Sequence, residues 1–385
     1  MIFRKIRHAL PLASLLVPVA TDKVRAEDVS PIQLDLTYTG DVLSNVQGGL
    51  KRGTAYMDNL DVTLSIDGER ALGWEGAQIF VYGLYNNGQP FSHVYAGDYQ
   101  VVSNIETGVQ AVRLYEAWID QTFANDRASL RVGLYDLNSE FTAIEAAALF
   151  VNSSQGTGAE LAQTGKNGPS IFPYTSLSAR LEMKLADHLI LRTAILDGVP
   201  DDPEHPKRTA INLGNGNGAL VIGEIDYNLE KFRAVAGYWR YTARFPDQLT
   251  DIPQRGNQGA YGFVEGRFDR LSVFARAGWA NAVINPVKYY FSTGAVYSID
   301  PATRPDDHVG VAIAWAESGS TYRRLKDAEA REVVVELTYH SAITDFLSVQ
   351  PDLQYVFNPN FDANVKNALV VGLRFELSFG YGFSH

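Results

Sequence analysis

Between about residues 31 and 379 the chain repeats short stretches in which apolar and polar side chains alternate. In residues 177–185, for example, one strand face would carry only aliphatic side chains, and the other would carry Arg180, Glu182 and Lys184. Such a strand needs hydrocarbon on one side and water on the other. A soluble sheet can also show this pattern, but a closed membrane barrel requires it on nearly every strand. The pattern therefore predicts an all-β protein, a membrane-spanning antiparallel up-and-down β-barrel.

Sixteen stretches show the alternation. They cover residues 31–42, 56–67, 74–85, 110–122, 127–136, 175–185, 188–197, 219–227, 231–241, 259–268, 271–280, 288–299, 307–316, 331–340, 346–357 and 367–379. The connections between them are by turns long and short, and this order is typical of outer-membrane barrels, which have tight turns at one rim and long loops at the other. A soluble β-sandwich gives no reason for it. An even number of strands would bring both termini to the periplasmic rim.

The faces of most strands can be assigned from the pattern. In residues 331–340, Val333, Val335 and Leu337 would meet lipid, while Glu336 and His340 would face the lumen. The stretch at 110–122 does not sort in this way, because either register sends an ionised side chain, that of Arg113 or of Glu116, outward. A β-bulge would resolve the conflict, and so would cover by another subunit.

The first 26 residues have the pattern of a secretory signal peptide. Three basic residues precede an apolar segment at 9–20, and small or aliphatic residues lead to an expected cleavage site after Ala26. A retained anchor is the alternative, but the apolar segment is shorter than the roughly 20 residues that a spanning helix needs. We therefore expect one barrel domain over residues 27–385.

Composition excludes several classes of function. The chain carries 33 basic and 44 acidic residues, a formal net charge of −11, so binding to nucleic acid is not expected. It has no cysteine, and its seven histidines show no pair at ligand spacing, so we expect no disulfide, no metal site and no cofactor. The sequence has no Gly-x-Ser-x-Gly elbow, and Gly214–Gly218 lacks the spacing of a phosphate loop. No catalytic residue is predicted, and we do not expect an enzyme.

The longest connection, residues 137–174, is too long for a simple turn. It contains an apolar run between Phe141 and Phe150 that would not remain in water. We expect this segment to fold into the lumen, narrow the pore and bring Asp136, Asn138 and Glu140 against basic side chains of the wall. A surface lid or a contact between subunits is the alternative.

Seven short motifs, in order along the chain, resemble those of the OprB-type carbohydrate-selective porins of Gram-negative outer membranes. They are Tyr38-Thr39-Gly40-Asp41 with Gly48-Gly49, Ser103-Asn104-Ile105-Glu106, Arg113-Leu114-Tyr115-Glu116 with Trp118 and Gln121, Asn138-Ser139-Glu140-Phe141, Phe150-Val151-Asn152-Ser153-Ser154, Pro169-Ser170-Ile171-Phe172-Pro173 and Gln350-Pro351-Asp352-Leu353-Gln354-Tyr355 ending in Asn358-Pro359. The resemblance implies a sixteen-stranded outer-membrane barrel that passes monosaccharides such as glucose by facilitated diffusion, with the third loop as the constriction.

A sugar ring offers hydroxyl groups at its rim and apolar C–H faces, so a selective pore needs polar partners and aromatic rings at a narrow point. The predicted lumen face and loop supply Arg131, Tyr135, Asp136, Asn138, Glu140, Arg180, Arg192, Arg276 and Arg374 as candidate substrate-binding residues. The family motif adds Arg113, Glu116 and Trp118. The alternative is that these arginines and carboxylates brace the barrel wall by pairing with one another, and that Trp118 lies in an interfacial belt.

Three functions agree with these features. A sugar-selective channel is the first, with carbohydrate solutes and outer-membrane lipid as partners. A general or cation-preferring diffusion pore is the second, since the chain is acidic. An enzyme on a barrel scaffold is the third and has the least support, because no serine nucleophile with a nearby base is evident. The sequence leaves open whether a single chain or a homotrimer forms the pore, and which sugar is preferred.

Overall fold

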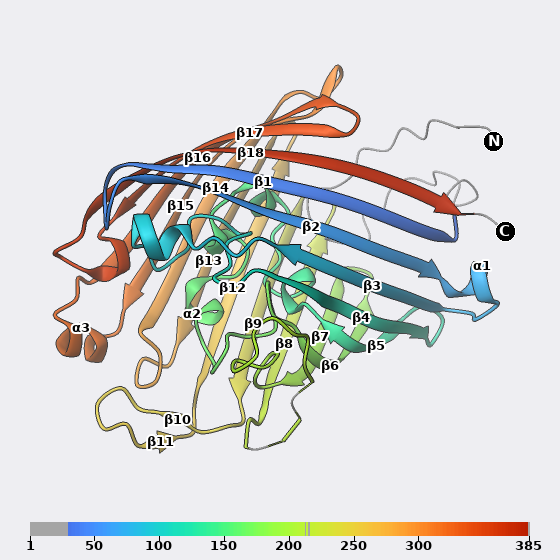
Figure 1. The fold of residues 1–385 in the computed structure, drawn as a ribbon. Coiled ribbons are helices and arrows are strands. Elements are labelled where there is room, and N and C mark those ends of the chain that lie inside the picture. The colour runs from blue at the N-terminus through green and yellow to red at the C-terminus, as the bar shows by residue number, and fades with distance from the viewer. Residues whose placement is uncertain (1–29, 212, 215, 384–385) are drawn as a thin grey trace.

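The computed structural model describes residues 30–383 except 212 and 215, so the predicted signal peptide lies outside the described residues. Sixteen strands form one closed barrel, in which each strand pairs antiparallel with its neighbours in sequence order and β1 closes the ring against β18 (Figure 1). The strands are β1 Ile32–Gly49, β2 Gly53–Asp67, β3 Ala77–Asn86, β4 Ala111–Phe123, β5 Ala128–Tyr135, β6 Ser176–Ala186, β7 Leu189–Asp197, β8 Ala219–Leu229, β9 Phe232–Tyr241, β12 Gln258–Phe268, β13 Leu271–Ala280, β14 Val287–Asp300, β15 Arg304–Ser318, β16 Arg331–Thr344, β17 Leu347–Phe357 and β18 Lys366–Phe383.

Each of the sixteen predicted stretches coincides with one of these strands, which confirms the predicted fold class. The first connection differs from the prediction. We expected a long loop after residue 42, but β1 continues to Gly49 and only residues 50–52 separate it from β2. The pattern fades after Val42 because the apolar Leu43 faces inward, at 1% exposure, and the polar Ser44 faces outward. The last residues of β1 are also irregular. Gly48 and Gly49 adopt positive φ angles, and the register with β18 shifts at this point.

The two rims of the barrel differ in the length of their connections. The terminal rim carries both described chain ends, since Ile32 pairs with Phe383, and it has short turns such as residues 187–188 and 269–270. The opposite rim, called here the loop rim, carries the long connections. These include helix α3 (Ser320–Lys326) and the small sheet of β10 (Phe245–Pro246) and β11 (Pro253–Gln254), while α1 (Gly68–Leu72) lies at the terminal rim (Figure 1).

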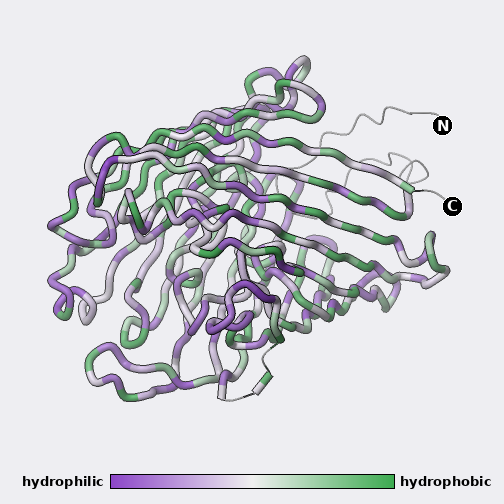
Figure 2. The backbone as a smooth tube through the Cα atoms, in the orientation of Figure 1, coloured by the Kyte–Doolittle hydropathy of each residue, from purple (hydrophilic) through white to green (hydrophobic). Residues whose placement is uncertain are grey.

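The predicted faces are confirmed. Figure 2 shows apolar and polar residues alternating along the strands of the barrel. On β16, Leu337 is 49% exposed on the outer face while its neighbour Glu336 is fully buried on the inner face. The same alternation holds on β18, where Leu373 lies outside and Arg374 inside. The alternation within each strand therefore gives the barrel an apolar outer surface and a polar interior.

A β-bulge resolves the strand that the sequence pattern could not sort. Tyr82 of β3 pairs with Glu116 of β4, whereas the next residue, Gly83, pairs with Leu114, so Tyr115 is the extra residue. Arg113 and Glu116 are three positions apart and would face opposite sides of a regular strand. The extra residue lets both side chains face the interior, where they are buried (4% and 3% exposed). No second subunit is needed to cover either charge.

One carboxylate on the outer face breaks the alternation. Asp58 of β2 has the same orientation as Tyr56, toward the outside. The hydroxyl of Tyr38 donates to Asp58 Oδ2 at 2.7 Å and lies 2.5 Å from the hydroxyl of Tyr56. Two tyrosine rings therefore shield this carboxylate on the side that faces lipid.

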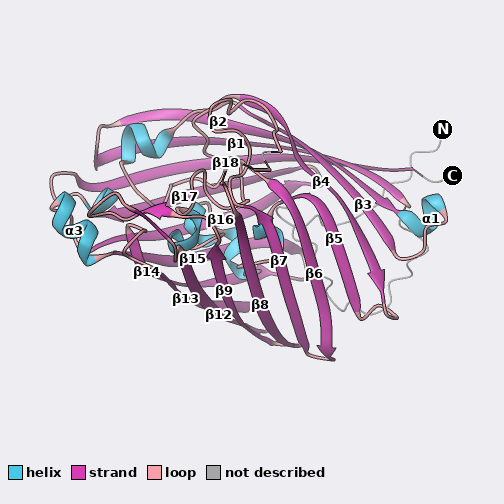
Figure 3. Cartoon of the chain, turned by 90° about the horizontal axis from the view of Figure 1, so that it is seen from below, coloured by secondary structure: helices cyan, strands magenta, loops and turns pink. Residues whose placement is uncertain are grey.

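The long third connection folds into the barrel, as predicted. Residues 137–174, called here the inward loop, contain three 3-10 turns (Leu137–Ser139, Ala146–Leu149 and Ser153–Gln155) and helix α2 (Ala159–Ala162), and Figure 3 shows helical turns within the ring of strands. Its apolar run is buried, although only one short turn of it is helical. Among the described residues, every helix is too short or too polar to cross a bilayer.

Candidate functional site

Carboxylates of the barrel wall hold the inward loop by its backbone. Glu336 of β16 accepts from Val151 N at 2.6 Å and from Asn152 N at 3.2 Å, and Glu224 of β8 accepts from Thr142 N at 3.1 Å. These contacts join residues more than 80 positions apart in the sequence. Because each wall carboxylate is buried and accepts a backbone N–H, the loop is fixed in one position across the lumen.

Arg276 of β13 binds the same loop from another side. Its guanidinium donates to the carbonyl oxygens of Thr142, Ser154 and Gln155 at 2.5–3.4 Å. The side chain is buried, so the structure places this predicted solute-binding arginine beneath the loop as an anchor. Arg276 thus holds the inward loop against β13.

A group of paired charges lies where the inward loop meets β4, β5 and β6. Arg180 donates to both oxygens of Glu140, at 2.8 and 2.9 Å, and to Asp120 Oδ2 at 2.6 Å. Arg131 donates to the same Asp120 oxygen at 3.0 Å and approaches Glu140 Oε1 at 3.5 Å. We call Asp120, Arg131, Glu140 and Arg180 the charge girdle. Tyr135 completes it by donating its hydroxyl hydrogen to Glu140.

Register explains why these side chains meet. Asp120 of β4 pairs with Arg131 of β5, and Arg131 pairs with Arg180 of β6, so one row of inward side chains crosses three strands. Glu140 enters the row from the inward loop. Burial raises the pKa of the Glu140 carboxyl, but the three nearby arginines lower it more, and the result is a pKa of about 2.

Trp118 and Glu116 form the layer next to the charge girdle. The guanidinium of Arg131 lies 3.7 Å from the centre of the Trp118 ring, which also stacks on Phe80 at 5.0 Å. Trp118 Nε1 donates to Glu116 at 3.1 Å, and Glu116 also accepts from Asp136 N. Trp118 is 4% exposed and faces inward, so it does not belong to an interfacial belt. Its ring is covered by Arg131.

Arg192 of β7 extends the row of paired charges toward β8. It donates to Glu182 at 2.7 Å and to Glu224 at 3.3 Å, and its guanidinium lies 5.9 Å from the ring of Phe141. Arg233 of β9 continues the pattern with Asp226 and Glu265. The inward-facing arginines of β5, β6, β7 and β9 therefore each have at least one carboxylate partner.

Arg374 and Asp41 pair on the other side of the barrel, across β18 and β1. Arg374 Nε and Nη2 donate to the two oxygens of Asp41 at 2.7 and 2.8 Å. Nη2 also donates to Asn104 Oδ1 at 2.7 Å. Asn104 belongs to the connection of residues 87–110, so this pair holds a second loop inside the barrel.

Arg113 lies apart from the other predicted residues. It donates to the carbonyl oxygen of Pro206, lies 3.8 Å from Asp201 and packs 4.9 Å from the ring of Tyr174. Its partners Asp201 and Pro206 belong to the connection of residues 198–218 at the loop rim. The structure therefore places Arg113 as a support of that connection and not in the charge girdle.

Asp136 and Asn138 shape the start of the inward loop. The Asp136 carboxylate accepts hydrogen bonds from the Tyr115 hydroxyl and from the backbone N–H of Asn138. The second bond caps the first 3-10 turn of the inward loop. Asn138 donates to Phe141 O and Thr142 Oγ1 and remains half-buried. Burial raises the pKa of the Asp136 carboxyl to about 6.

Sequence reasoning missed several members of this site. Asp120, Glu224 and Arg233 were not predicted, and Asp41 was named only within a family motif, although each carries a main ion pair. Asp120 could have been found, because it follows Trp118 and Glu116 at every second position on the inward face of β4. Among the described residues, no three histidine or acidic side chains are arranged to hold a metal ion.

Comparison with known proteins gives consistent results. The model of the family described as "Carbohydrate-selective porin, OprB family" matches residues 51–379. Porin B of Pseudomonas aeruginosa is 24% identical over 405 residues, covering 89% of this chain and 87% of that protein. The high-pH structure of Pseudomonas putida OprB superposes with a TM-score of 0.80 at 20% identity, over 91% and 94% of the two chains. The outer-membrane channel DcaP of Acinetobacter baumannii gives 0.58 at 12% identity, over 92% and 99%.

Proposed function

The chain belongs to the OprB family of carbohydrate-selective porins, and from this premise we propose that it passes single sugar molecules of the size of glucose along the row of paired charges. The protein is an outer-membrane carbohydrate porin of a Gram-negative bacterium. In such a barrel the terminal rim faces the periplasm and the loop rim faces outward. Members of this family are channels, not enzymes.

The observation that carries the proposal is the pairing of charge where the inward loop meets the barrel wall of β4 to β9. Each arginine of β5, β6, β7 and β9 that faces inward is bound to carboxylates, and the side chains keep only small exposed edges, such as 12% for Glu140 and 20% for Glu182. A neutral sugar can donate to a carboxylate edge and accept from a neighbouring guanidinium without separating the pair. An ion would have to compete with a fixed partner of opposite charge.

Weak binding suits this role. A solute that only shares hydrogen bonds with already paired groups gains little free energy, because each group keeps its original partner. Such a site releases its solute readily, and a channel for facilitated diffusion needs this property. The aromatic rings nearby are partly covered, Trp118 by Arg131 for example, so hydrogen bonding rather than stacking is proposed to dominate.

The proposal is tested by sugar block of the ion current through the protein in planar bilayers. Glucose should lower the current in a saturable manner, and the Arg192→Gln variant, which removes donors from the proposed path, should weaken this block severalfold. Arg113→Gln serves as the matched control, because its guanidinium supports a connection at the loop rim. A wild-type current that glucose does not affect would contradict the proposal.

A general cation-preferring pore is the second candidate, and one observation favours it. Asp35, Asp61 and Glu376 face the lumen from β1, β2 and β18, and they form no ion pair with any residue that the structure describes. Unpaired carboxylates would attract cations. The reversal potential in a salt gradient separates the two candidates, since a cation-preferring pore gives a strongly cation-selective potential and a current that glucose does not block.

A further inference from the structure

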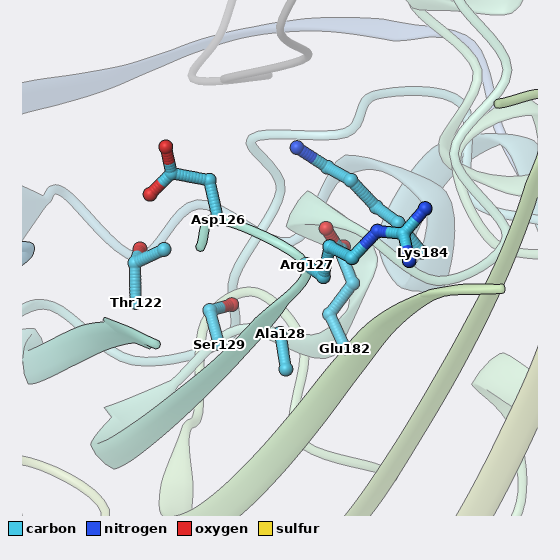
Figure 4. A pocket seen from close by; sticks show the side chains of 7 residues that line it. All are labelled: Thr122, Asp126, Arg127, Ala128, Ser129, Glu182 and Lys184. Atoms are coloured by element: carbon cyan, nitrogen blue, oxygen red, sulfur yellow. The ribbon is translucent and has the colours of Figure 1, made fainter. Parts of the chain in front are cut away.

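A small pocket opens inside the barrel near the terminal rim, on the periplasmic side of the charge girdle. Its volume is about 230 Å³, and it is lined by Thr122, Asp126, Arg127, Ala128, Ser129, Glu182 and Lys184 (Figure 4). This volume is below the roughly 300–1,000 Å³ of sites for drug-sized ligands. The pocket therefore suits one sugar ring and not an oligosaccharide.

The register of the strands places this pocket next to the charge girdle, on its terminal-rim side. Thr122 of β4 pairs with Ser129 of β5, and Ser129 pairs with Glu182 of β6. On each strand this row lies two residues closer to the terminal rim than the row of Asp120, Arg131 and Arg180. Two residues of a strand span about 7 Å. A solute leaving the girdle toward the periplasm thus reaches this pocket next.

Some of the pocket's polar groups are already bound. Glu182 accepts from Arg192 Nη2 at 2.7 Å and from Nε at 3.0 Å, so its charge is compensated. The Ser129 hydroxyl accepts from Arg180 at 2.6 Å and keeps its own hydrogen for another partner. Both residues can therefore take part in hydrogen bonds with a sugar while they remain attached to the wall.

The remaining charges of the pocket are unbalanced. The side chains of Arg127 and Lys184 form no ion pair with any residue in the described part of the chain, and the two residues are neighbours, since Lys184 N donates to Arg127 O at 2.8 Å. Asp126 is the one lining carboxylate without an arginine partner, and Figure 4 shows its side chain across the pocket from those of Arg127 and Glu182. Two free cations against one free carboxylate leave a local positive surplus in a chain of net charge −11.

We propose that this pocket is an exit subsite for an anionic monosaccharide, one that carries a carboxylate or a phosphate group. The acidic group lies between Arg127 and Lys184, where a guanidinium and an ammonium both donate to it, and the hydroxyl groups face Thr122, Ser129 and Glu182. This inference rests on the proposed function, because it assumes that carbohydrate passes the girdle. It adds sugar acids and sugar phosphates to the solutes that bind at the periplasmic mouth of the channel, whereas the girdle itself favours neutral sugars.

The test uses the whole barrel in planar bilayers, with gluconate, glucose 6-phosphate, glucose or inorganic phosphate added on the periplasmic side. Both sugar anions should block the ion current at lower concentrations than glucose or inorganic phosphate. In the variant Arg127→Gln/Lys184→Gln, the half-blocking concentration of the sugar anions should rise at least about tenfold, as the loss of charge-assisted hydrogen bonds implies. Block by glucose should not change, which also shows that the variant barrel is intact.

A matched control removes the same charges elsewhere on the same rim. Lys231 and Arg270 lie in other short turns, outside the pocket, so Lys231→Gln/Arg270→Gln should leave block by the sugar anions unchanged. If the sugar anions blocked the pocket variant and the wild type at equal concentrations, the subsite would be overturned. The same conclusion would follow if inorganic phosphate blocked the wild type as well as the sugar anions do. A response of only one sugar anion would support the subsite and identify its acidic group. Failure of glucose to block the wild type would instead contradict the proposed function.

Discussion

Glu140, on the inward loop, is held by two parallel hydrogen bonds from Arg180 of the barrel wall, with Nε–Oε2 and Nη2–Oε1 distances of 2.8 and 2.9 Å. The two residues are 40 positions apart and join the inward loop to the middle of β6. Arg180 is among the most deeply buried large side chains of the molecule. The position of the constriction therefore depends on a pair of charges that solvent scarcely reaches.

The variant Glu140→Gln should release this end of the inward loop. Loss of the carboxylate leaves Arg131 and Arg180 short of an acceptor in a buried site, and breaking a buried pair costs about 3–5 kcal/mol. We expect a larger and noisier single-channel conductance, together with a lower thermal unfolding midpoint of the detergent-solubilised barrel.

A control for this variant lies on the same loop. Glu145 pairs with Arg267 at 2.6 Å, but both side chains are about half exposed, at 56% and 51%. Exposed pairs contribute only about 0–1 kcal/mol. Glu145→Gln should therefore leave the conductance and the unfolding midpoint nearly unchanged. Equal effects of the two variants would show that the buried pair has no special role.

Glu160 should make the stability of the channel depend on pH. It lies in α2 of the inward loop, against Gly278 of β13, where a side chain on the glycine would meet the carboxylate. Burial raises the pKa of the Glu160 carboxyl to about 7, although Arg276 opposes the shift. A raised pKa means that the protonated carboxyl stabilises the folded state below its ordinary pKa, and that this stabilisation is lost as the pH rises through about 7.

The measurement is the thermal unfolding midpoint at about pH 5 and about pH 8, in wild type and in Glu160→Gln. The wild-type midpoint should fall at the higher pH, and the glutamine variant should fall less, because its side chain does not ionise. The same fall in both proteins would assign the pH dependence to other groups.

Asp41 and Arg374 should be energetically coupled. Their two hydrogen bonds and the further contact to Asn104 are buried, so Asp41→Asn and Arg374→Gln each leave a buried partner unsatisfied. A double-mutant cycle on the unfolding free energy should give a coupling of about 0.5–3 kcal/mol. Additive effects of the two substitutions would mean that the pair does not hold the loop of residues 87–110.

The bulge of β4 should determine which way Arg113 faces. Tyr115 is the extra residue, so its deletion would make the pairing regular and leave both Arg113 and Glu116 inside the barrel. One alanine inserted between Arg113 and Leu114 would instead turn Arg113 outward into lipid, because a shift of one residue exchanges the two faces of a strand. Folding can be followed by the shift in gel mobility between folded and heated barrel. The insertion should weaken the folded band, and the Tyr115 deletion should preserve it. The opposite result would contradict the role given to the bulge.

The strands and their faces could be predicted because a period of two is a local property of the sequence. On β16, the alternation of Val333, Glu336 and Leu337 indicates both the strand and its orientation without knowledge of any partner. The extent of β1 was missed because the alternation reverses after Val42, where the apolar Leu43 faces the interior and the polar Ser44 faces outward. The strand at 110–122 showed a conflict in the pattern, and the structure explains it by an inserted residue.

The partners of the candidate residues could not be predicted, since they depend on the closed barrel. Arg276 binds carbonyl oxygens more than 120 positions away, and backbone carbonyls leave no signal in a sequence. Arg113 carries the family motif but reaches a connection that lies 88 positions further along the chain, at Asp201. Many residues of the lumen face were identified, whereas the finding that some of them anchor loops required the structure.

The central claim is that the charges of the constriction are paired and therefore favour a neutral sugar over an ion of the same size. Swelling of liposomes that contain the protein tests this claim most directly, with glucose and a zwitterion of similar size compared at equal osmolarity. Swelling should be faster in glucose than in the zwitterion, and the difference should be smaller in Glu140→Gln. Equal rates of swelling for glucose and the zwitterion in the wild type would contradict it.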